Sequence, residues 1–287
     1  MEKLLIIDSS ALLYRFFHAL PPLTTPQGEP IQAIYGLTNV LLKIATYEGP
    51  EYIVAALDRP EPTFRKEAFD AYKSQRPKAS DDLIIQIKKI PEVFSLFGIK
   101  TLSAKGFEAD DIIGTLAEKF KNYANLKIII FTGDLDALQL IEGDKITCRI
   151  IKTGVSEAEI YDEDRVYKRF GIYPSNLTNY KALTGDSSDN IPGIPGIGPK
   201  SAAELIQDFK TIEEIFENLM IINPKIAKKL EGKEKDALLY RDLVTVRRNV
   251  KEAMEINLED LKNHPLDKNK IKEYCEKMGF GSLVKKL

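Results

Sequence analysis

Three short apolar runs in the first half of the chain each end at an acidic residue. LLIID ends at Asp8, YIVAALD ends at Asp58 and KIIIFTGD ends at Asp134. Continuous runs of this length, rich in Ile, Val and Leu, predict strands that are buried on both faces of a parallel sheet. Helical patterns separate them, namely QAIYGLTNVLLKIATY, DDLIIQIKKIPEVFSLFG and ADDIIGTLAEKFKNY. The alternation predicts an α/β, doubly wound and mostly parallel sheet.

The pattern changes after about residue 145. CRIIKTG and EAEIYD predict a small β-hairpin or edge pair, and DEDRVYKRFG predicts a short helix that ends at a glycine. The rest of the chain is helical in pattern, with breaks at Pro224, Gly232 and Pro265. We therefore expect an α/β domain over residues 1–190 and a helical region over 191–287 that packs closely on it.

The bulk composition excludes several classes of protein. Of 287 residues, 44% are hydrophobic and 29% charged, as is usual for a soluble globular protein. No apolar run approaches the roughly 20 residues of a membrane span, and the N-terminal segment does not have the pattern of a signal peptide. Cys148 and Cys275 form no metal-type pair, and His18 and His264 stand alone, so a zinc site or a His-dependent triad is not expected. We expect a cytoplasmic protein without a membrane partner.

Carboxylates are concentrated in GFEADDIIG, which holds Glu108, Asp110 and Asp111. Acidic residues suit the first turn of a helix, and a lone Asp after a strand is usually a turn or capping residue. Capping and turn roles explain some of these carboxylates one by one. The carboxyl ends of parallel strands, however, share one edge of the sheet, where ligands bind. Nine carboxylates are candidates for that edge: Asp8, Asp58, Glu108, Asp110, Asp111, Asp134, Asp136, Asp186 and Asp189.

Divalent cations would resolve the repulsion among these carboxylates. Each neighbouring negative charge disfavours the ionised form of the others, so a metal-free cluster would be costly. Oxygen ligands suit Mg²⁺ or Mn²⁺, and Mg²⁺ keeps several waters, so nine carboxylates are too many for one ion. The sequence predicts two ions, with room for a third, as in enzymes that catalyse in-line phosphoryl displacement. The net charge of −2 includes these nine carboxylates, so the remaining surface is basic enough to hold a polyanion.

The first stretch that could hold nucleic acid is FRKEAFDAYKSQRPK, residues 64–78. Cations pair with phosphates and aromatic rings stack on unpaired bases. An amphipathic helix with its aromatic residues in the core is an equally good interpretation. The cations are Arg65, Lys66, Lys73, Arg76 and Lys78, and the aromatic residues are Phe64, Phe69 and Tyr72.

The second stretch is GIPGIGPKSAAELI, residues 193–206. Gly193, Gly196 and Gly198 mark a tight turn that enters a helix at Pro199, and Lys200 adds a positive charge. The stretch resembles the helix-hairpin-helix motif, which holds the duplex backbone without reading bases.

Taken together, these motifs closely resemble the 5′-nuclease family, which includes the 5′-3′ exonuclease domain of bacterial DNA polymerase I, phage 5′-exonucleases and flap endonucleases. RFFHAL, FRKEAFDAYKSQR, FEADDIIG, ALTGDSSDNIPGIPGIGPK and FGSL carry the resemblance, which covers essentially the whole chain and is strongest to the polymerase I domain. No polymerase domain follows, so the chain resembles a free-standing version or an excised domain.

The resemblance implies a role for each carboxylate, and none of the nine is missing. Asp8, Asp58, Glu108 and Asp110 should surround one metal. Asp134, Asp136 and Asp186 should surround the second, with Asp110 near both. Asp111 and Asp189 correspond to an additional bacterial pair.

The resemblance also implies a DNA-binding surface. A helical arch over about residues 62–82 should place Lys73 and Arg76 at the scissile phosphate, with Arg65 and Tyr72 as further DNA contacts. Arg15 should lie by the substrate, although a surface salt bridge is nearly as good an interpretation. The hairpin from Gly193 to Lys200 should hold the duplex, with K⁺ as a possible ligand. Leu135 departs from the family pattern, which has Lys there; both neighbouring aspartates remain.

These features imply a structure-selective, Mg²⁺- or Mn²⁺-dependent 5′-3′ exonuclease and 5′-flap endonuclease of replication and repair. We expect a monomer that binds DNA at 5′ flaps or junction ends, with a DNA polymerase as a partner in trans. A PIN-like ribonuclease and a binding-only junction protein are alternatives; the hairpin disfavours the first and the complete carboxylate set the second. A haloacid-dehalogenase-type phosphatase would need a second Asp after the first strand, and DSSAL lacks it.

Overall fold

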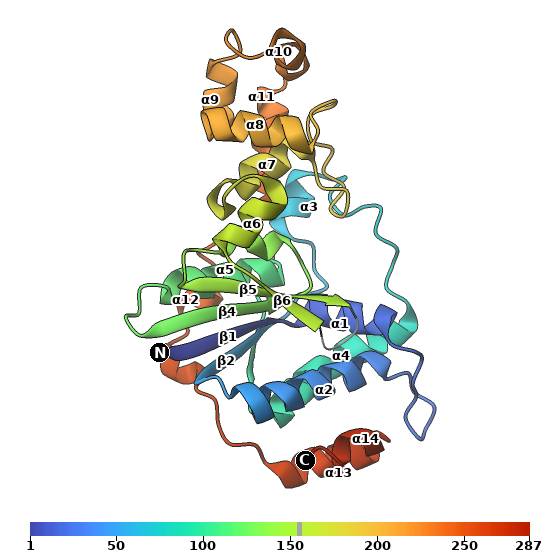
Figure 1. Ribbon diagram of the computed structural model, residues 1–287. Coiled ribbons are helices and arrows are strands. Elements are labelled where there is room, and N and C mark those ends of the chain that lie inside the picture. Colours follow the sequence, from blue (N-terminus) through green and yellow to red (C-terminus); the bar gives the residue numbers. More distant parts are fainter. Residues whose placement is uncertain (154–156) are drawn as a thin grey trace.

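The computed structural model describes residues 1–153 and 157–287. A six-stranded sheet in the order β3-β2-β1-β4-β5-β6 forms its centre (Figure 1). β1 to β5 are parallel, and β6 runs antiparallel to β5 at the edge. The doubly wound, mostly parallel sheet and the edge pair are confirmed; the sequence pattern did not predict β3, which has three residues. The strands are β1 Glu2–Asp8, β2 Tyr52–Ala56, β3 Lys100–Leu102, β4 Leu126–Thr132, β5 Ile146–Thr153 and β6 Glu157–Tyr161.

Helices cover both faces of the sheet because successive side chains of a strand point to opposite faces. Leu5 and Ile7 of β1 pack into the cluster formed by α1, α2 and α4. Leu4 and Ile6 pack into the cluster that contains α5. These helices are α1 Ser9–Ala19, α2 Gln32–Lys43 with a π-helical turn η1 Ile44–Glu48, α4 Asp81–Leu96 and α5 Ala109–Phe120.

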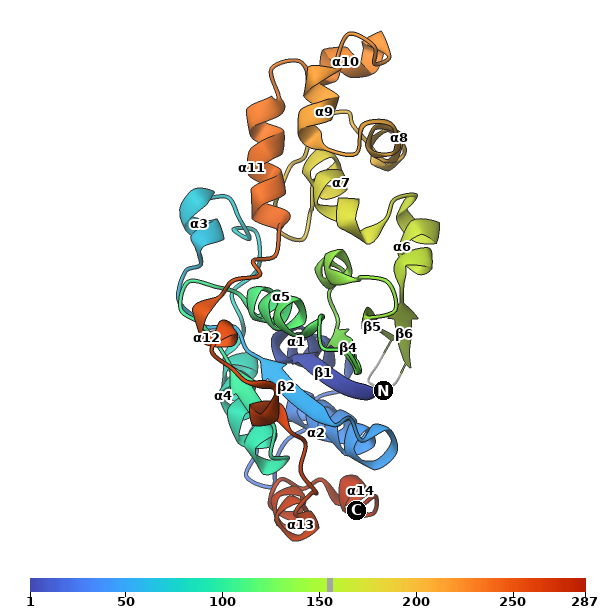
Figure 2. The same ribbon diagram turned by 90° about the vertical axis from the view of Figure 1, so that its left-hand side faces the viewer.

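A helical part stands on one end of the sheet layer (Figures 1 and 2). Its buried residues, such as Ile194 and Leu205, belong to the same core cluster as Leu4 and Ile6, so the two parts share one core. The expected break at Pro224 is present: one helix ends at Glu217 and the next begins at Pro224, because proline suits the first helical turn. The helices are α6 Glu163–Phe170, α7 Leu177–Thr184, α8 Pro199–Phe209, α9 Ile212–Glu217, α10 Pro224–Leu230 and α11 Glu234–Val244, with 3₁₀ turns η2 Asp136–Leu140 and η3 Pro174–Asn176.

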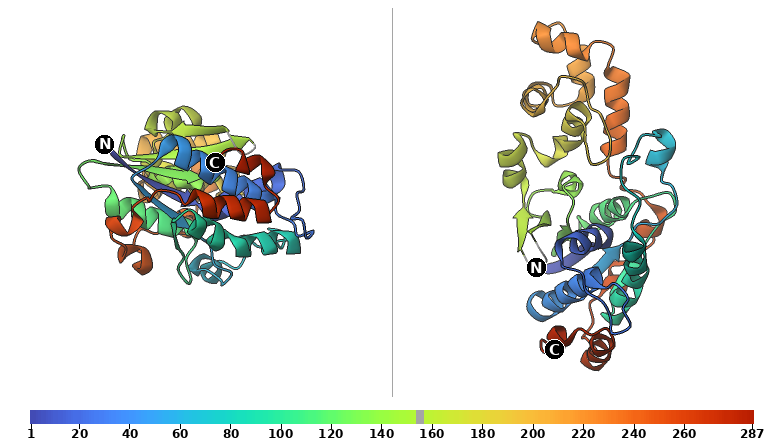
Figure 3. Two further views of the ribbon diagram at one scale, coloured as in Figure 1. Left: turned by 90° about the horizontal axis from the view of Figure 1, so that it is seen from below. Right: turned by 90° about the vertical axis from the view of Figure 1, so that its right-hand side faces the viewer.

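The C-terminal residues return to the sheet part. α12 Lys251–Met254, η4 Leu258–Leu261, α13 Lys268–Lys277 and α14 Gly281–Val284 follow α11, and α13 and α14 lie at the end of the molecule opposite α10 (Figures 2 and 3). Ile271, Cys275 and Phe280 are buried in the cluster that contains Leu5. The expected single helical region over 191–287 is thus divided in space, because the apolar face of α13 needs the sheet part to cover it.

The segment expected to form a helical arch, residues 62–82, contains one short helix, α3 Phe64–Ala68, before α4 begins. Turns follow α3, and Lys73 has a φ of 51°, which an α-helix does not accept. In Figure 1 this segment forms a long connection beside the carboxyl ends of the parallel strands.

Among the helices of the described residues, none is both long and apolar enough to span a bilayer.

Candidate active site

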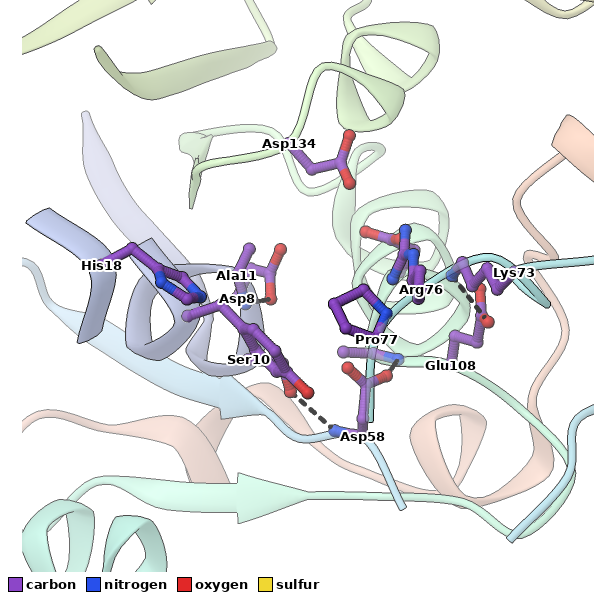
Figure 4. A pocket seen from close by; sticks show the side chains of 13 residues that line it. Asp8, Ser10, Ala11, His18, Asp58, Lys73, Arg76, Pro77, Glu108 and Asp134 are labelled. Carbon is purple, nitrogen blue, oxygen red and sulfur yellow. Dashed lines mark hydrogen bonds and ion pairs between the residues drawn. The ribbon is translucent and has the colours of Figure 1, made fainter. Parts of the chain in front are cut away.

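A cavity of about 440 Å³ lies at the carboxyl ends of β1, β2 and β4. Five of the nine predicted carboxylates line it, and the cations Lys73 and Arg76 lie at its wall (Figure 4). The strand-final acidic residues therefore meet at one edge of the sheet, as their positions predicted. The five carboxylates are Asp8, Asp58, Glu108, Asp110 and Asp134.

Local hydrogen bonds fix the first two carboxylates. Asp8 ends β1 and caps α1, since its Oδ1 accepts from the Ala11 N–H at 3.0 Å, while its Oδ2 accepts from Thr132 Oγ1 at 2.6 Å. Asp58 follows β2, and its Oδ1 accepts from the Ala109 N–H at 2.8 Å at the start of α5. Each carboxylate is thus held by donors of the surrounding elements: Asp8 by α1 and β4, and Asp58 by the start of α5.

The cavity is electrostatically strained in the metal-free protein. Burial, together with Asp58 and Asp134, raises the pKa of Asp8 to about 7, although Thr132 and Ala11 oppose the shift. Burial and the charges of Asp8, Asp134 and Asp136 raise the pKa of Asp110 well above its usual range. A divalent cation would reverse both shifts, because it favours the ionised form.

Asp136 and Asp186 are not part of the cavity lining, and Lys181 of α7 joins them. Lys181 Nζ donates to Asp186 Oδ2 at 2.7 Å and to Asp136 Oδ1. Burial raises the pKa of Asp136 to about 7 despite Lys181. Burial acts in the same direction on Asp186, but the Lys181 ammonium and Ser188 outweigh it and lower that pKa to about 2. The sequence analysis did not single out Lys181; its place five residues before Asp186, in the helix that leads to TGDSSDN, was the available signal.

The structure does not place Asp111 and Arg65 where the sequence interpretation did. Asp111 is fully buried, and its two oxygens accept from Arg65 at 2.7 Å each and from the backbone N–H groups of Glu108 and Arg247. Arg65 is only 2% exposed and also donates to the Leu243 and Thr245 carbonyls. In this conformation both side chains are used by a buried bidentate pair, and the assignments of Asp111 to a metal and Arg65 to DNA stay predictions.

Tyr72 also differs from its expected role as a DNA contact. Its ring is only 3% exposed and packs beside Ile191, and its hydroxyl donates to Glu108 Oε2 at 3.0 Å and Asp189 Oδ2 at 2.9 Å. In this conformation the ring is not open for stacking on a base, and the role of Tyr72 as a DNA contact stays a prediction. The alternative, in which the aromatic residues of 64–78 face the core, holds for Tyr72.

Lys73 and Arg76 reach the carboxylates from the segment after α3. Lys73 Nζ lies 2.8 Å from Glu108 Oε1, and Arg76 Nη2 lies 2.6 Å from Asp189 Oδ1 (Figure 4 labels Lys73, Arg76 and Glu108). Asp189 is outside the lining of the cavity, and its oxygens face Tyr72 and Arg76. The two cations thus stand opposite the buried carboxylates, where an anion between them would contact both charges.

One face of α1 extends the cavity sideways. Ala11, Tyr14 and His18 line both the main cavity and a shallower hollow that also includes Arg15 and Gly133. Arg15 therefore lies beside the cavity rather than inside it. The sequence analysis missed Tyr14 and His18; their spacing of three and seven residues from Ala11 places them on one helix face and could have indicated them.

The hairpin lies between α7 and α8. Gly193 and Gly196 have φ values of 67° and 83°, Pro199 begins α8, and the Lys200 side chain is 91% exposed. Lys229 of α10 donates to the Gly196 carbonyl at 2.7 Å. The turn predicted from the glycines is present outside the cavity: Gly196 and Gly198 are exposed, Gly193 is buried, and Gly198 has an ordinary φ of −93°.

Within the described residues, no three acidic, His or Cys side chains are arranged to hold a metal ion as the side chains stand. Lys73, Arg76 and Lys181 occupy several of the carboxylate oxygens in this conformation. The donor chemistry nevertheless fits a divalent ion: Asp8, Asp58 and Asp110 bring carboxylate oxygens to the cavity, and Asp8 and Asp110 have raised pKa values.

A parallel sheet with carboxylates at its carboxyl edge, cations opposite them and a helical hairpin beside them defines a class of metal-dependent nucleases. Two family models match the chain: 5′-3′ exonuclease, N-terminal resolvase-like domain, over residues 3–171, and 5′-3′ exonuclease, C-terminal SAM fold, over residues 172–269. The chain belongs to the 5′-3′ exonuclease family.

Two curated relatives illustrate its extent. The chain is 38% identical over 287 residues to DNA polymerase I of Caldicellulosiruptor bescii, covering 99% of this chain and 33% of the relative. It is also 38% identical over 291 residues to the 5′-3′ exonuclease of Aquifex aeolicus, covering 100% of this chain and 96% of the relative. The chain thus spans about a third of the polymerase and nearly all of the exonuclease.

Solved structures share the fold. T5 5′-exonuclease with bound divalent metal ions (zinc) matches with a TM-score of 0.70 at 21% identity, over 96% of this chain and 99% of that one. The catalytic core of Rad2 in complex with DNA substrate matches with a TM-score of 0.64 at 20% identity, over 96% and 88% of the two chains.

Proposed function

We propose that the protein hydrolyses phosphodiester bonds of DNA where a 5′ single strand meets a duplex, as a 5′-3′ exonuclease and 5′-flap endonuclease. The products are a 5′-phosphate and a 3′-hydroxyl. The observation that carries the proposal is the cavity itself, in which five carboxylates face Lys73 and Arg76. Family membership and the exposed hairpin support it.

Two divalent ions, Mg²⁺ or Mn²⁺, are the proposed cofactors. Asp8, Asp58, Glu108 and Asp110 would hold the first, and Asp134, Asp136 and Asp186 the second, with Asp110 near both. Such ions, when bound, activate water and stabilise the charge of a reacting phosphate. T5 5′-exonuclease, which shares the fold, binds divalent ions, and the buried carboxylates of this chain need a counter-charge.

The chain's own cations have the complementary role. Lys73 and Arg76 line the cavity in front of the carboxylates. There they would bind the scissile phosphate and stabilise the negative charge that develops on it in the transition state. Both must then exchange their present partners, Glu108 and Asp189, for phosphate oxygens. Arg15, in the adjoining hollow, would contact the substrate strand.

The exposed hairpin is the proposed duplex-binding element. Its glycines allow close approach of the backbone to phosphate, and Lys200 adds a free-standing charge. A K⁺ ion on the hairpin carbonyls is part of the proposal; the Gly196 carbonyl already accepts from Lys229, so such an ion would use other carbonyls of the turn. The catalytic core of Rad2, which shares the fold, binds a DNA substrate.

The biological setting is proposed from the family: the enzyme takes part in Okazaki-fragment processing and excision repair in the cytoplasm. It is proposed to be a monomer that acts with a DNA polymerase on a separate chain. The relatives named DNA polymerase I carry the matching region within a chain about three times as long, which supports a connection with polymerase action.

Cleavage of a 5′-labelled flap duplex tests the proposal, with Mg²⁺, Mn²⁺ or EDTA and with single-stranded RNA in parallel. We expect metal-dependent incision near the junction and intact RNA. DNA that is bound tightly but not cut would favour a binding-only protein, and cut RNA beside intact DNA would favour a ribonuclease.

Asp134→Ala tests the metal assignment. Asp134 lines the cavity and its Oδ1 accepts from the Asp136 N–H, so the substitution removes a ligand without disturbing the core. Turnover should fall by about 10³-fold or more while DNA binding changes little, since removing one group that stabilises transition-state charge has effects of this order. Asp144→Ala, in the exposed turn after β4, is the matched control. Full turnover of Asp134→Ala would exclude the two-metal assignment.

A further inference from the structure

The loop between α7 and α8 contains a short turn that contacts the segment after α3. Asp186 and Ile191 exchange two backbone hydrogen bonds of 2.8 Å each, which closes the turn over residues 187–190. Asp186 Oδ1 accepts from the N–H and hydroxyl of Ser188, at 2.9 and 2.6 Å, which fixes the turn internally. The turn is therefore a rigid support rather than a flexible connection.

The contacts between residues 187–190 and residues 71–76 are reciprocal, and we call them the clasp. The Asn190 side-chain amide donates to the Ala71 carbonyl at 2.7 Å and to Ser74 Oγ at 3.2 Å. In return, the Lys73 N–H donates to the Asp189 carbonyl at 2.9 Å. Both N–H bonds of the Asn190 amide are thus used, one on each side of Lys73.

The backbone at the clasp is left-handed on both sides. Among the described residues, three that are not glycine have a positive φ, and two of them are Lys73 at 51° and Asn190 at 59°. Asparagine adopts this conformation readily, whereas lysine does so at a cost. Such strain persists only where surrounding contacts determine the conformation, and it gathers at functional sites.

The backbone conformation of Lys73 determines the direction of its side chain and thus the position of its ammonium group. With its backbone held between the Ala71 and Asp189 contacts, the side chain turns into the cavity and places Nζ 2.8 Å from Glu108 Oε1. Without the clasp, Lys73 would relax to a negative φ, and its side chain would leave that direction.

We propose that Asn190 is a positioning residue: its amide holds Lys73 in the left-handed conformation that directs the Lys73 ammonium into the carboxylate cavity. The inference rests on the proposed role of Lys73 in the chemical step. The Asn190 side-chain amide donates to the segment 71–76, and Asn190 is not part of the cavity lining.

Asn190→Gly is the appropriate variant, because glycine keeps the positive φ and loses only the amide. We expect the single-turnover rate of flap cleavage to fall about 10- to 100-fold, as for a misplaced catalytic group. The dissociation constant for the same flap duplex in EDTA should stay within about twofold. Asn263→Gly is the matched control, since the Asn263 amide makes the same kind of bond, 2.9 Å to the Pro50 carbonyl, far from the cavity.

A double-mutant cycle separates positioning from general damage. In the Lys73→Ala background, Asn190→Gly should cause no further loss beyond about twofold, because the positioned group is gone. A full additional loss in that background would overturn the inference, and so would normal cleavage by Asn190→Gly while Lys73→Ala is impaired. If Lys73→Ala cleaves normally, both the inference and the proposed role of Lys73 fail.

Trypsin provides a readout that does not depend on activity. Lys73 lies within the clasp and is followed by Ser74, so Asn190→Gly should make the folded protein more susceptible to cutting after Lys73 than the Asn263→Gly control. Unchanged cutting after Lys73 would overturn the inference.

Discussion

Asp8 is a single residue whose ionised form is unfavourable in this fold. It is 3% exposed and faces Asp58 and Asp134 across the cavity. Its pKa is raised to about 7, above the usual value of 3.8, and that of Asp136 is raised to the same range. Ionising these residues in the folded, metal-free protein opposes folding, whereas the unfolded chain ionises them freely.

The direction of the pH effect follows from the raised pKa values. The protonated forms contribute stability that is fully present below pH 3.8 and is lost as pH rises through about 7. In EDTA, the melting temperature should therefore fall between pH 5 and pH 8, and Mg²⁺ should restore more stability at pH 8 than at pH 5. Thermal unfolding at several pH values measures both effects.

Asp8→Asn should flatten this pH dependence, because it removes a titrating group and keeps a side chain that can hydrogen-bond to Ala11 and Thr132. Asp144→Asn, in an exposed turn, should leave the dependence unchanged. If Asp8→Asn and the wild-type protein lose stability in parallel between pH 5 and pH 8, the raised pKa of Asp8 is not the cause.

Among the elements, the turn between α7 and α8 is the one that most depends on glycine. Gly193 has a φ of 67°, and a Cβ built there would lie 2.2 Å from the Gly185 nitrogen and 2.5 Å from the Thr184 carbonyl carbon. No real Cβ tolerates such contacts, and the neighbours are backbone atoms that cannot move aside. The close approach of two backbone segments explains the residue.

Gly193→Ala should lower the free energy of unfolding by about 2–4 kcal/mol, the sum of left-handed strain and overpacking. Gly198→Ala is the matched control, because its φ is −93° and no atom lies within 4 Å of the added Cβ. The control should change stability by about 1 kcal/mol or less. Urea unfolding of both variants measures the difference; equal losses would refute the backbone argument.

On the scale of the whole molecule, the chain's C-terminal helices stabilise the sheet part from the side away from the hairpin. Phe280 is 1% exposed and packs edge-on against Tyr35 of α2 at 5.2 Å between ring centroids. Residues more than 240 positions apart in the sequence therefore form one cluster, and the cavity lies elsewhere.

Phe280→Ala should destabilise the protein by about 3–5 kcal/mol, as is typical of a deleted buried aromatic ring. Flap cleavage by the folded variant at low temperature should match the wild-type rate, because the substitution does not touch the cavity. Tyr47→Ala, at a side chain that is 83% exposed, should change stability by about 0.5 kcal/mol or less. A Phe280→Ala protein of normal stability would show that α14 is not part of the cooperative core.

The sequence alone determined the sheet apart from β3, most helices and the meeting of Asp8, Asp58 and Asp134 at one edge. Short apolar runs mark the buried strands, and the carboxyl ends of parallel strands lie at the same edge. The hairpin glycines were likewise readable, since positive φ restricts the residue type. Family resemblance supplied the roles proposed for Lys73 and Arg76.

Only the tertiary structure decided which of the charged residues are partners. Arg65 and Asp111 are 46 positions apart and form a buried pair, and Lys181 joins Asp136 to Asp186. Asn190 reaches Ala71 across 119 positions. Spacing along the chain carries no information about such contacts, because they form only when separate elements pack together. A buried charge or amide then needs a hydrogen-bond partner, and that partner can come from any element packed beside it.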